Sequence, residues 1–269
     1  MIARKVAATM AATVVALGLS ASAAGAWAPA GSATVHPGIQ TFTDGAQCTA
    51  NFVYTDGTNT YLGQAAHCSG TGGNTETNGC TAKSLPDGTK VDVTGASQPG
   101  TMVYNSWNAM KRVGETDADT CQYNDIALLQ LAAADVANTN PSIPFWGGPT
   151  GVNTTGTQVG DEVESYGNSE LRGGITALSP KEGKSVGDAG NGWSHGVYTV
   201  SPGIPGDSGS AFLDSTGKAL GILSTLEALP LPASNNVGDV NKELAWMHAH
   251  GGPNATVVNG TQPFTGPLL

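Results

Sequence analysis

Three short stretches of this chain carry side chains that could act together on one substrate. His67 lies in YLGQAAHCSG, Asp125 lies in CQYNDIALLQL, and Ser208 lies in SPGIPGDSGSAFLD. A serine hydroxyl is a weak nucleophile until an imidazole takes its proton, and the imidazole needs a carboxylate that fixes its tautomer. If these three side chains meet in the fold, they are sufficient for nucleophilic catalysis through a covalent intermediate.

Each of the three residues also has an ordinary interpretation. Most histidines are surface or core residues, an aspartate often begins a strand, and serine with glycine is common in turns. The chain order is more informative, because His, Asp, Ser differs from the Ser, Asp, His order of α/β-hydrolases and the Asp, His, Ser order of subtilisins. The elbow pattern G-x-S-x-G also fails, since Ser210 occupies its last position.

Taken together, AAHC, NDIALL and PGDSGS resemble the motifs around the catalytic residues of secreted bacterial chymotrypsin/trypsin-like serine proteases. The resemblance assigns the general base to His67, the acid to Asp125 and the nucleophile to Ser208. It also assigns the oxyanion hole to the backbone N–H groups of Gly206 and Ser208. Softer matches, in VGDEVESYGNSELRGGITALSP and KALGILS, extend the resemblance over nearly the whole chain after its first segment.

The elements that must position these residues read as antiparallel β-structure. Short apolar runs lie between Gly, Asn and Asp turns, which is typical of antiparallel strands. The resemblance implies an all-β fold of two antiparallel six-stranded β-barrels, with His and Asp in residues 29–140 and Ser in residues 141–269. A C-terminal helix is expected in VGDVNKELAWMHAHGG, with Asp239 or Asn241 as its N-cap.

The first segment reads as a secretory signal peptide over residues 1–28, with cleavage near residues 26–30. Arg4 and Lys5 precede an apolar stretch, and Ala-x-Ala patterns follow it. The apolar stretch is shorter than the about 20 residues that a membrane-spanning helix needs, so an uncleaved anchor is the less favoured alternative. We therefore expect a secreted, extracellular protein that has no membrane association after cleavage.

The chain has four cysteines: Cys48, Cys68, Cys80 and Cys121. An even number in an exported chain favours disulfides, and spacing alone leaves three pairings open. A zinc site would need ligands at short spacing, and no two of these cysteines lie within four residues, so no metal is expected. The protease resemblance implies a bridge between Cys48 and Cys68, which leaves Cys80 and Cys121 as a hypothetical second pair.

The resemblance places four residues around the specificity pocket: Pro202, Ser224, Thr225 and Leu226. Pro202 stands where trypsins carry an aspartate, so the pocket offers no carboxylate to a Lys or Arg side chain. Leu226 stands where many relatives have glycine, and it should narrow the mouth of the pocket. We therefore expect a small or medium-sized apolar side chain before the scissile bond.

The aspartate before the nucleophile, Asp207, needs a cationic partner. Animal members of the family pair this aspartate with a newly formed N-terminus, and no matching cleavage site is visible here. The position where many bacterial relatives carry an arginine aligns with Ser165, so Arg172 is our substitute candidate. His195, in a glycine-rich stretch, is expected to be an ordinary loop residue.

The composition limits the partners. Asp and Glu outnumber Lys and Arg by 21 to 11, and the formal net charge of −10 disfavours nucleic acid and anionic membranes as ligands. We expect a monomer that acts on protein or peptide substrates as a serine endopeptidase and needs no cofactor. Two alternatives stay open: a catalytically silent binding protein with this fold, and an esterase that uses the same three residues.

Overall fold

The structure is a computed structural model that describes residues 27–73, 76–226 and 233–268. Nearly all of the expected signal peptide, residues 1–26, lies outside the described residues. Within them, no helix combines the length and the apolarity that crossing a membrane requires.

The elements have the following bounds. The strands are β1 (Gln40–Thr43), β2 (Ala46–Thr49), β3 (Val53–Thr55), β4 (Thr60–Ala65), β5 (Lys90–Val93), β6 (Gly100–Asn105), β7 (Ile126–Gln130), β8 (Glu162–Tyr166), β9 (Pro180–Ala189), β10 (Ser194–Thr199), β11 (Ala211–Asp214), β12 (Ala219–Leu226), β13 (Asn235–Asp239) and β14 (Thr256–Val257). The α-helices are α1 (Ser106–Val113), α2 (Ala118–Tyr123), α3 (Ala133–Val136) and α4 (Val240–Ala249). The 3-10 helices are η1 (Ala66–Ser69), η2 (Glu170–Arg172), η3 (Thr176–Leu178) and η4 (Gly190–Gly192).

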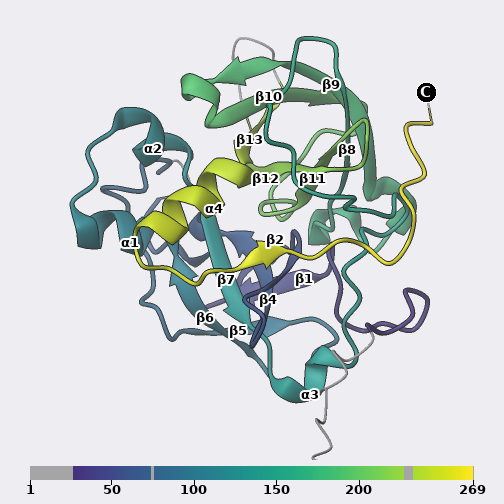
Figure 1. Ribbon diagram of the computed structural model, residues 1–269, viewed down its shortest axis with the longest axis horizontal. Helices are drawn as coiled ribbons and strands as arrows, with labels where there is room; N and C mark the ends of the chain where they lie inside the picture. The colour runs from purple at the N-terminus through teal and green to yellow at the C-terminus, as the bar shows by residue number, and fades with distance from the viewer. Residues whose placement is uncertain (1–26, 74–75, 227–232, 269) are drawn as a thin grey trace, which may run out of the picture.

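The later strands form a closed barrel. Strands β8 to β13 pair antiparallel in the order β10-β13-β12-β11-β8-β9, and they are the upper, green group in Figure 1. Side chains at alternate positions of a strand point to the same face, so short strands with apolar residues at such positions can fill a barrel. The buried apolar cluster of this barrel consists of Val163, Val197, Phe212, Leu220, Leu223 and Val237.

The earlier strands form a sheet in the order β14-β3-β4-β7-β6-β5-β1-β2. Between β2 and β3, Asn51 N–H donates to Gly63 O at 2.9 Å and Gly63 N–H donates to Phe52 O at 3.0 Å. Strands β2 and β3 are therefore two halves of one bent strand, which pairs with β1 at one end and with β4 at the other. Gly63 permits this bend, because a Cβ there would lie 1.9 Å from the Asn51 side-chain oxygen.

When β2 and β3 are counted as one strand, β1 to β7 make a ring of six, because β5 pairs back onto β1. Strand β14 is added at the edge of this ring, where it pairs with β3. The C-terminal residues thus return to the first sheet, although they follow the barrel strands in the sequence. The predicted all-β fold class is confirmed, with one closed barrel and a second antiparallel sheet.

Helix α4 lies at the junction of the two sheets, between the green and the teal strands of Figure 1. The Asp239 side chain accepts the N–H of Lys242 at 2.7 Å, so Asp239 is the N-cap and Asn241 is not. Helix α4 packs against β12 of the barrel. On the other side, Glu243 Oε1 accepts the N–H of Asp125 at 2.8 Å. The helix therefore links the barrel to the residue that precedes β7.

Helix α1 is an element that the strand-rich sequence did not predict. The Asn105 side chain caps it by accepting the N–H groups of Trp107 and Asn108, at 3.0 and 3.3 Å. Gly114 ends it in the left-handed conformation, with φ of +70°. An asparagine before the helix and a glycine after it are ordinary end signals, but the helix has only eight residues.

Glu164 on β8 is a buried carboxylic acid that has no hydrogen-bond partner among the described residues. Burial, followed by the charges of Glu182, Glu162 and Asp214, raises the pKa of Glu164 from 4.5 to about 8. In the unfolded chain this carboxyl should titrate near its ordinary value. Between pH 4.5 and about 8 the folded state therefore binds more protons than the unfolded state. The contribution of Glu164 to the free energy of unfolding consequently falls as the pH rises through this range.

Replacing Glu164 with glutamine is expected to remove this pH dependence. From pH 5 to pH 8 the free energy of unfolding of Glu164→Gln should rise relative to wild type by on the order of 4 kcal/mol. Urea denaturation of the disulfide-intact proteins at both pH values measures the difference. If the difference between variant and wild type is the same at pH 5 and pH 8, Glu164 does not carry a raised pKa.

Candidate active site

The pairing of β4 with β7 brings His67 to Asp125. Ala65, the last residue of β4, lies opposite Ile126, the first residue of β7. The chain continues from β4 directly into η1, which carries His67. Asp125 precedes β7, and its carbonyl accepts the N–H of Ala66 at 2.9 Å. The strand register and the bond from Ala66 therefore place His67 next to Asp125.

Asp125 is the centre of a hydrogen-bond cluster. Its Oδ2 lies 2.7 Å from His67 Nδ1 and accepts the Ser224 hydroxyl at 2.5 Å. Its Oδ1 accepts the main-chain N–H of His67 at 2.8 Å. Because Asp125 is buried, these donors replace the water that a carboxylate would otherwise bind. The contact assigns the proton of a neutral His67 ring to Nδ1 and leaves Nε2 able to accept a proton.

Opposing effects act on the pKa of His67. Burial of the ring lowers this pKa, whereas the charge of Asp125 and the hydrogen bond to it raise it. The net result is a pKa of His67 above the ordinary value of 6.5. The His67 side chain is still 25% exposed, so the ring is accessible to a molecule at the surface.

Ser208 stands on a turn that packs against the end of β4. Thr49 N–H donates to the Ser208 carbonyl at 2.8 Å. Gly209 lies so close that a Cβ there would be 2.7 Å from Thr49 O and 2.9 Å from Ala65 N, and its φ is +86°. A glycine after Ser208 is therefore needed for the barrel to bring this turn against the end of the strand that leads to His67.

The structure brings His67 and Asp125 into direct contact, whereas no hydrogen bond joins Ser208 to His67 among the described residues. Contacts between a nucleophile and its base are often long without substrate and shorten when substrate binds. The N–H groups of Gly206 and Ser208 also donate no hydrogen bond within the described part of the chain. Two free N–H groups beside a serine are what an oxyanion hole requires.

Asp207, the residue before Ser208, is buried with two cations. Its Oδ2 lies 2.5 Å from an Arg172 nitrogen and 3.0 Å from Lys181 Nζ. Arg172 is thus a partner of Asp207, as the sequence indicated. Lys181 was not predicted, because a lysine in a polar strand reads as a residue that faces solvent. Burial lowers the pKa of the Lys181 ammonium below 10.5 in spite of the neighbouring carboxylate.

Two of the expected pocket residues, Pro202 and Ser224, contact the charged groups of the site. The Pro202 carbonyl accepts hydrogen bonds from Arg172 and Lys181, both at 3.3 Å. The Ser224 hydroxyl donates to Asp125 and therefore points toward the pair formed by His67 and Asp125. The side chain of Ser224 thus has a role that its expected place in a pocket wall did not suggest.

The other two expected pocket residues, Thr225 and Leu226, lie at the end of β12, where Leu226 is 53% exposed. The Asn235 side chain joins this strand to the segment before Ser208. Its Oδ1 accepts the N–H of Gly203 at 2.8 Å, and its Nδ2 donates to Thr225 O at 3.2 Å. A Cβ on Gly203 would lie 2.9 Å from the Asn235 side chain. No sequence pattern pointed to Asn235, which stands in a polar, turn-like stretch.

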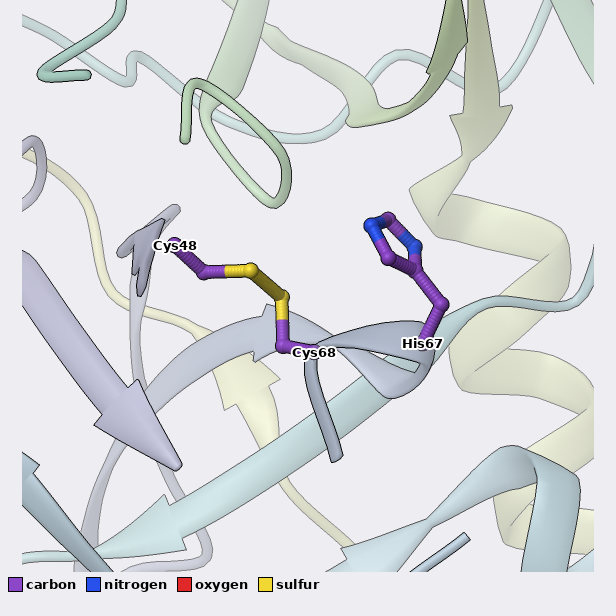
Figure 2. Close-up of side chains that lie close together, drawn as sticks. All are labelled: Cys48, His67 and Cys68. Atoms are coloured by element: carbon purple, nitrogen blue, oxygen red, sulfur yellow. A yellow bond between two sulfur atoms is a disulfide. The ribbon is translucent and has the colours of Figure 1, made fainter. Parts of the chain in front are cut away.

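Both disulfides lie in the first half of the chain, one between Cys48 and Cys68 and one between Cys80 and Cys121. Figure 2 shows the His67 imidazole beside the disulfide, and the short helix η1 carries both His67 and Cys68. Ligand atoms of Cys48, His67 and Cys68 lie within 4.8 Å of one another. The two sulfurs are bonded to each other and offer no thiolate, so this group is not a metal site.

His195 is not the ordinary loop residue that the sequence indicated. It lies on β10 and is fully buried, with Nδ1 2.7 Å from Asp188 and Nε2 3.0 Å from Asp239. Burial lowers the pKa of His195, but the hydrogen bonds and charges of the two aspartates outweigh it and raise the pKa above 6.5. The glycines around His195 concealed the strand, and one of its two acidic partners, Asp239, is 44 positions away in the sequence.

Several solved structures share this fold over most of the chain. Protease A of Thermobifida fusca has a TM-score of 0.53 and 16% identity, with 84% of this chain and 99% of that chain covered. A glutamic acid-specific serine protease that uses a histidine triad in substrate binding has a TM-score of 0.51 and 20% identity, with 83% and 100% covered. A Glu endopeptidase has a TM-score of 0.52 and 14% identity, with 79% and 91% covered.

No protein-family model matches the chain, and no curated protein sequence matches it. The likeness is therefore one of fold and is not visible as a sequence match. We conclude that this chain has the chymotrypsin-like fold of serine proteases.

Proposed function

We propose that the chain is a secreted serine endopeptidase that hydrolyses peptide bonds through an acyl-enzyme, with His67, Asp125 and Ser208 as its catalytic residues. The 2.7 Å contact between His67 Nδ1 and Asp125 carries the proposal, because it prepares the imidazole to act as a base. The position of the Ser208 turn against the end of β4 supports it. The fold shared with serine proteases supports it as well.

In the proposed reaction, Ser208 Oγ attacks the scissile carbonyl carbon while His67 Nε2 takes the hydroxyl proton. A C–O bond forms, the carbonyl π electrons move to oxygen, and the N–H groups of Gly206 and Ser208 bind that oxyanion. When this intermediate collapses, the C–N bond breaks and His67 gives the proton to the leaving amine. Water then attacks the acyl-enzyme in the same way, which releases the carboxylic acid and restores Ser208. Asp125 stabilises the imidazolium in both halves.

We infer that the side chain before the scissile bond is small or medium-sized and apolar. Pro202 supplies no side-chain charge, and the Asn235 side chain links Gly203 to Thr225, so a long substrate side chain would have to displace it. Cleavage of a peptide library measures this preference. We expect small or medium-sized apolar residues to dominate the profile, and a profile dominated by Arg, Lys or Glu would contradict the inference.

Hydrolysis of casein, compared with hydrolysis of a p-nitrophenyl ester, tests the proposed reaction. We expect the protein to hydrolyse both and to lose both activities after treatment with a serine-directed sulfonyl fluoride. Ester hydrolysis without cleavage of casein would favour the esterase alternative. A folded protein with neither activity would favour the binding-protein alternative.

The acid limb of the pH profile should report the ionisation of His67. Only the neutral imidazole can take the proton of Ser208, so kcat/KM should rise as the pH rises through the pKa of His67. Because Asp125 raises this pKa, we expect the midpoint of the acid limb above pH 6.5. Values of kcat/KM for a peptide amide between pH 4 and pH 9 measure it. A midpoint below pH 6 would contradict the stabilising effect of Asp125.

Export, which rests on the signal-like first segment, and a monomeric state are also proposals. N-terminal sequencing of protein recovered from the medium should find a start near residues 26–30. Gel filtration of that protein should give the mass of a monomer. An unprocessed N-terminus that stays with the membrane fraction would favour the anchor alternative.

A further inference from the structure

The two N–H groups of the proposed oxyanion hole belong to peptide units that are held in different ways. In a trans peptide the N–H and the C=O point in opposite directions, so a partner that fixes the carbonyl also fixes the N–H. The Asp207 carbonyl accepts the N–H of Ser210 at 3.0 Å. The direction of the Ser208 N–H is therefore set by a hydrogen bond within the main chain.

The peptide unit that carries the Gly206 N–H is held by a side chain instead. The Pro205 carbonyl accepts the hydroxyl of Ser169 at 2.5 Å. Ser169 is buried, and its Oγ also accepts the N–H of Leu171 at 3.1 Å, so its own loop fixes the direction of this hydroxyl. Gly206 has a φ of +94°. A glycine at this position lets the peptide unit between Pro205 and Gly206 rotate easily if the hydrogen bond from Ser169 is lost.

The first sheet holds Gly206 from the other side. The Gly206 carbonyl accepts the hydroxyl of Thr49 at 2.7 Å and the side-chain amide of Gln47 at 3.0 Å. A Cβ on Gly206 would lie 2.1 Å from Gln47 Oε1 and 2.9 Å from Ser169 Oγ. Gly206 is therefore enclosed by these side chains, and its N–H points away from Ser169.

We propose that Ser169 is a positioning residue that directs the Gly206 N–H toward the oxyanion, an inference that rests on the proposed function. Without the Ser169 hydroxyl, the Pro205 carbonyl has no donor among the described residues, and the peptide unit can turn. A turned unit would place a carbonyl oxygen where the oxyanion must form, and two negative oxygens repel each other.

The same short segment also organises Asp207. The N–H of Ser169 donates to Asp207 Oδ1 at 3.0 Å, and Arg172, three residues later, binds Asp207 Oδ2. The segment from Ser169 to Arg172 therefore fixes both the residue before the nucleophile and the peptide unit before Gly206. In this chain, the oxyanion hole is held by an internal segment and needs no newly formed N-terminus for its assembly.

Kinetics of Ser169→Ala on a peptide amide test the proposal. We expect kcat to fall by at least about tenfold, toward the about 10²- to 10³-fold loss that follows removal of one oxyanion donor. KM and the midpoint of the acid limb should stay at their wild-type values, because the substrate contacts and the His67–Asp125 pair are unchanged. Ser169→Thr keeps a hydroxyl and should retain most of kcat.

Ser185→Ala is the matched control. Ser185 is a buried serine of the same barrel, and its hydroxyl also accepts the N–H of the residue two positions later, Gly187, at 3.0 Å. Its other contacts, to Thr157 and Gly196, do not involve the segment around Ser208. This variant should keep the wild-type kcat. Equal losses of kcat in both alanine variants would overturn the proposal, because they would reflect packing alone.

A crystal structure of Ser169→Ala supplies a readout that does not depend on activity. We expect the Pro205 carbonyl to turn toward Ser208 in this variant and to keep its wild-type direction in Ser185→Ala. An unchanged peptide unit together with an unchanged kcat would overturn the role of Ser169 and leave the proposed protease function intact. A wild-type protein that hydrolyses no peptide would instead overturn the function, while the crystal structure would still decide the role of Ser169.

Discussion

Replacing Asp125 with asparagine is expected to lower kcat/KM by about 10⁴-fold. Because Oδ1 accepts the main-chain N–H of His67, the amide oxygen of the asparagine should stay at that position. The amide NH₂ group then faces His67 Nδ1, where Oδ2 lies at 2.7 Å in the wild type. A donor there makes Nδ1 an acceptor and moves the ring proton to Nε2. In this tautomer His67 cannot take the proton of Ser208, and steady-state kinetics on a peptide amide measure the loss.

Asp135→Asn is the matched control for this variant. Asp135 is also buried, and its Oδ1 also accepts a main-chain N–H, that of Ser97, at 2.7 Å. It lies on α3, after β7, and takes no part in the contacts around His67. We expect this variant to keep kcat/KM near the wild-type value. A loss of less than about tenfold in a folded Asp125→Asn would contradict the role assigned to Asp125.

Replacing Asp207 with asparagine is expected to lower the free energy of unfolding by about 3–5 kcal/mol. The Asp207 carboxylate is fully buried beside Lys181, whose side chain is also fully buried, and Arg172, which is nearly so. An amide can accept a hydrogen bond but does not balance these two charges, so both cations would be left without a counter-charge. Urea denaturation with the disulfides intact measures the change.

Activity should fall in the same variant, because Asp207 lies between Gly206 and Ser208. The double variant Asp207→Asn/Lys181→Met removes one of the two unbalanced cations and replaces it with an apolar side chain of similar length. It should recover at least about 1 kcal/mol relative to Asp207→Asn alone. No recovery in the double variant, or a loss of less than about 1 kcal/mol in Asp207→Asn, would contradict the account of this cluster.

The sequence predicted those parts of the site that are encoded in short contiguous motifs. His67, Asp125 and Ser208 each stand in such a motif, and their order along the chain distinguished this fold class from two others. The N-cap of helix α4, Asp239, was one of the two candidates that the sequence offered, because a cap depends on residues only a few positions apart. Local chemistry of this kind can be read from a sequence without knowledge of the packing.

The parts that were missed depend on contacts between distant segments. Lys181 is buried because its side chain points from strand β9 toward Asp207, which lies 26 residues later in the chain. Ser169 and Pro205 meet only because the loop after β8 lies against the turn before Ser208. Strand β14 has two residues and no apolar pattern, and pairing with β3 alone makes it a strand. Burial of a polar side chain is a property of the assembled sheets, and neither composition nor periodicity reports it.

Labelling of the protein with a fluorophosphonate probe, followed by peptide mapping, tests the central claim most directly. Such a probe reacts with a serine hydroxyl only where a base and an oxyanion hole activate it. We expect wild type to be labelled at Ser208 and Ser208→Ala to remain unlabelled under the same conditions. Equal labelling of both proteins, or a folded wild type that is not labelled, would contradict the claim that His67, Asp125 and Ser208 act as one catalytic unit.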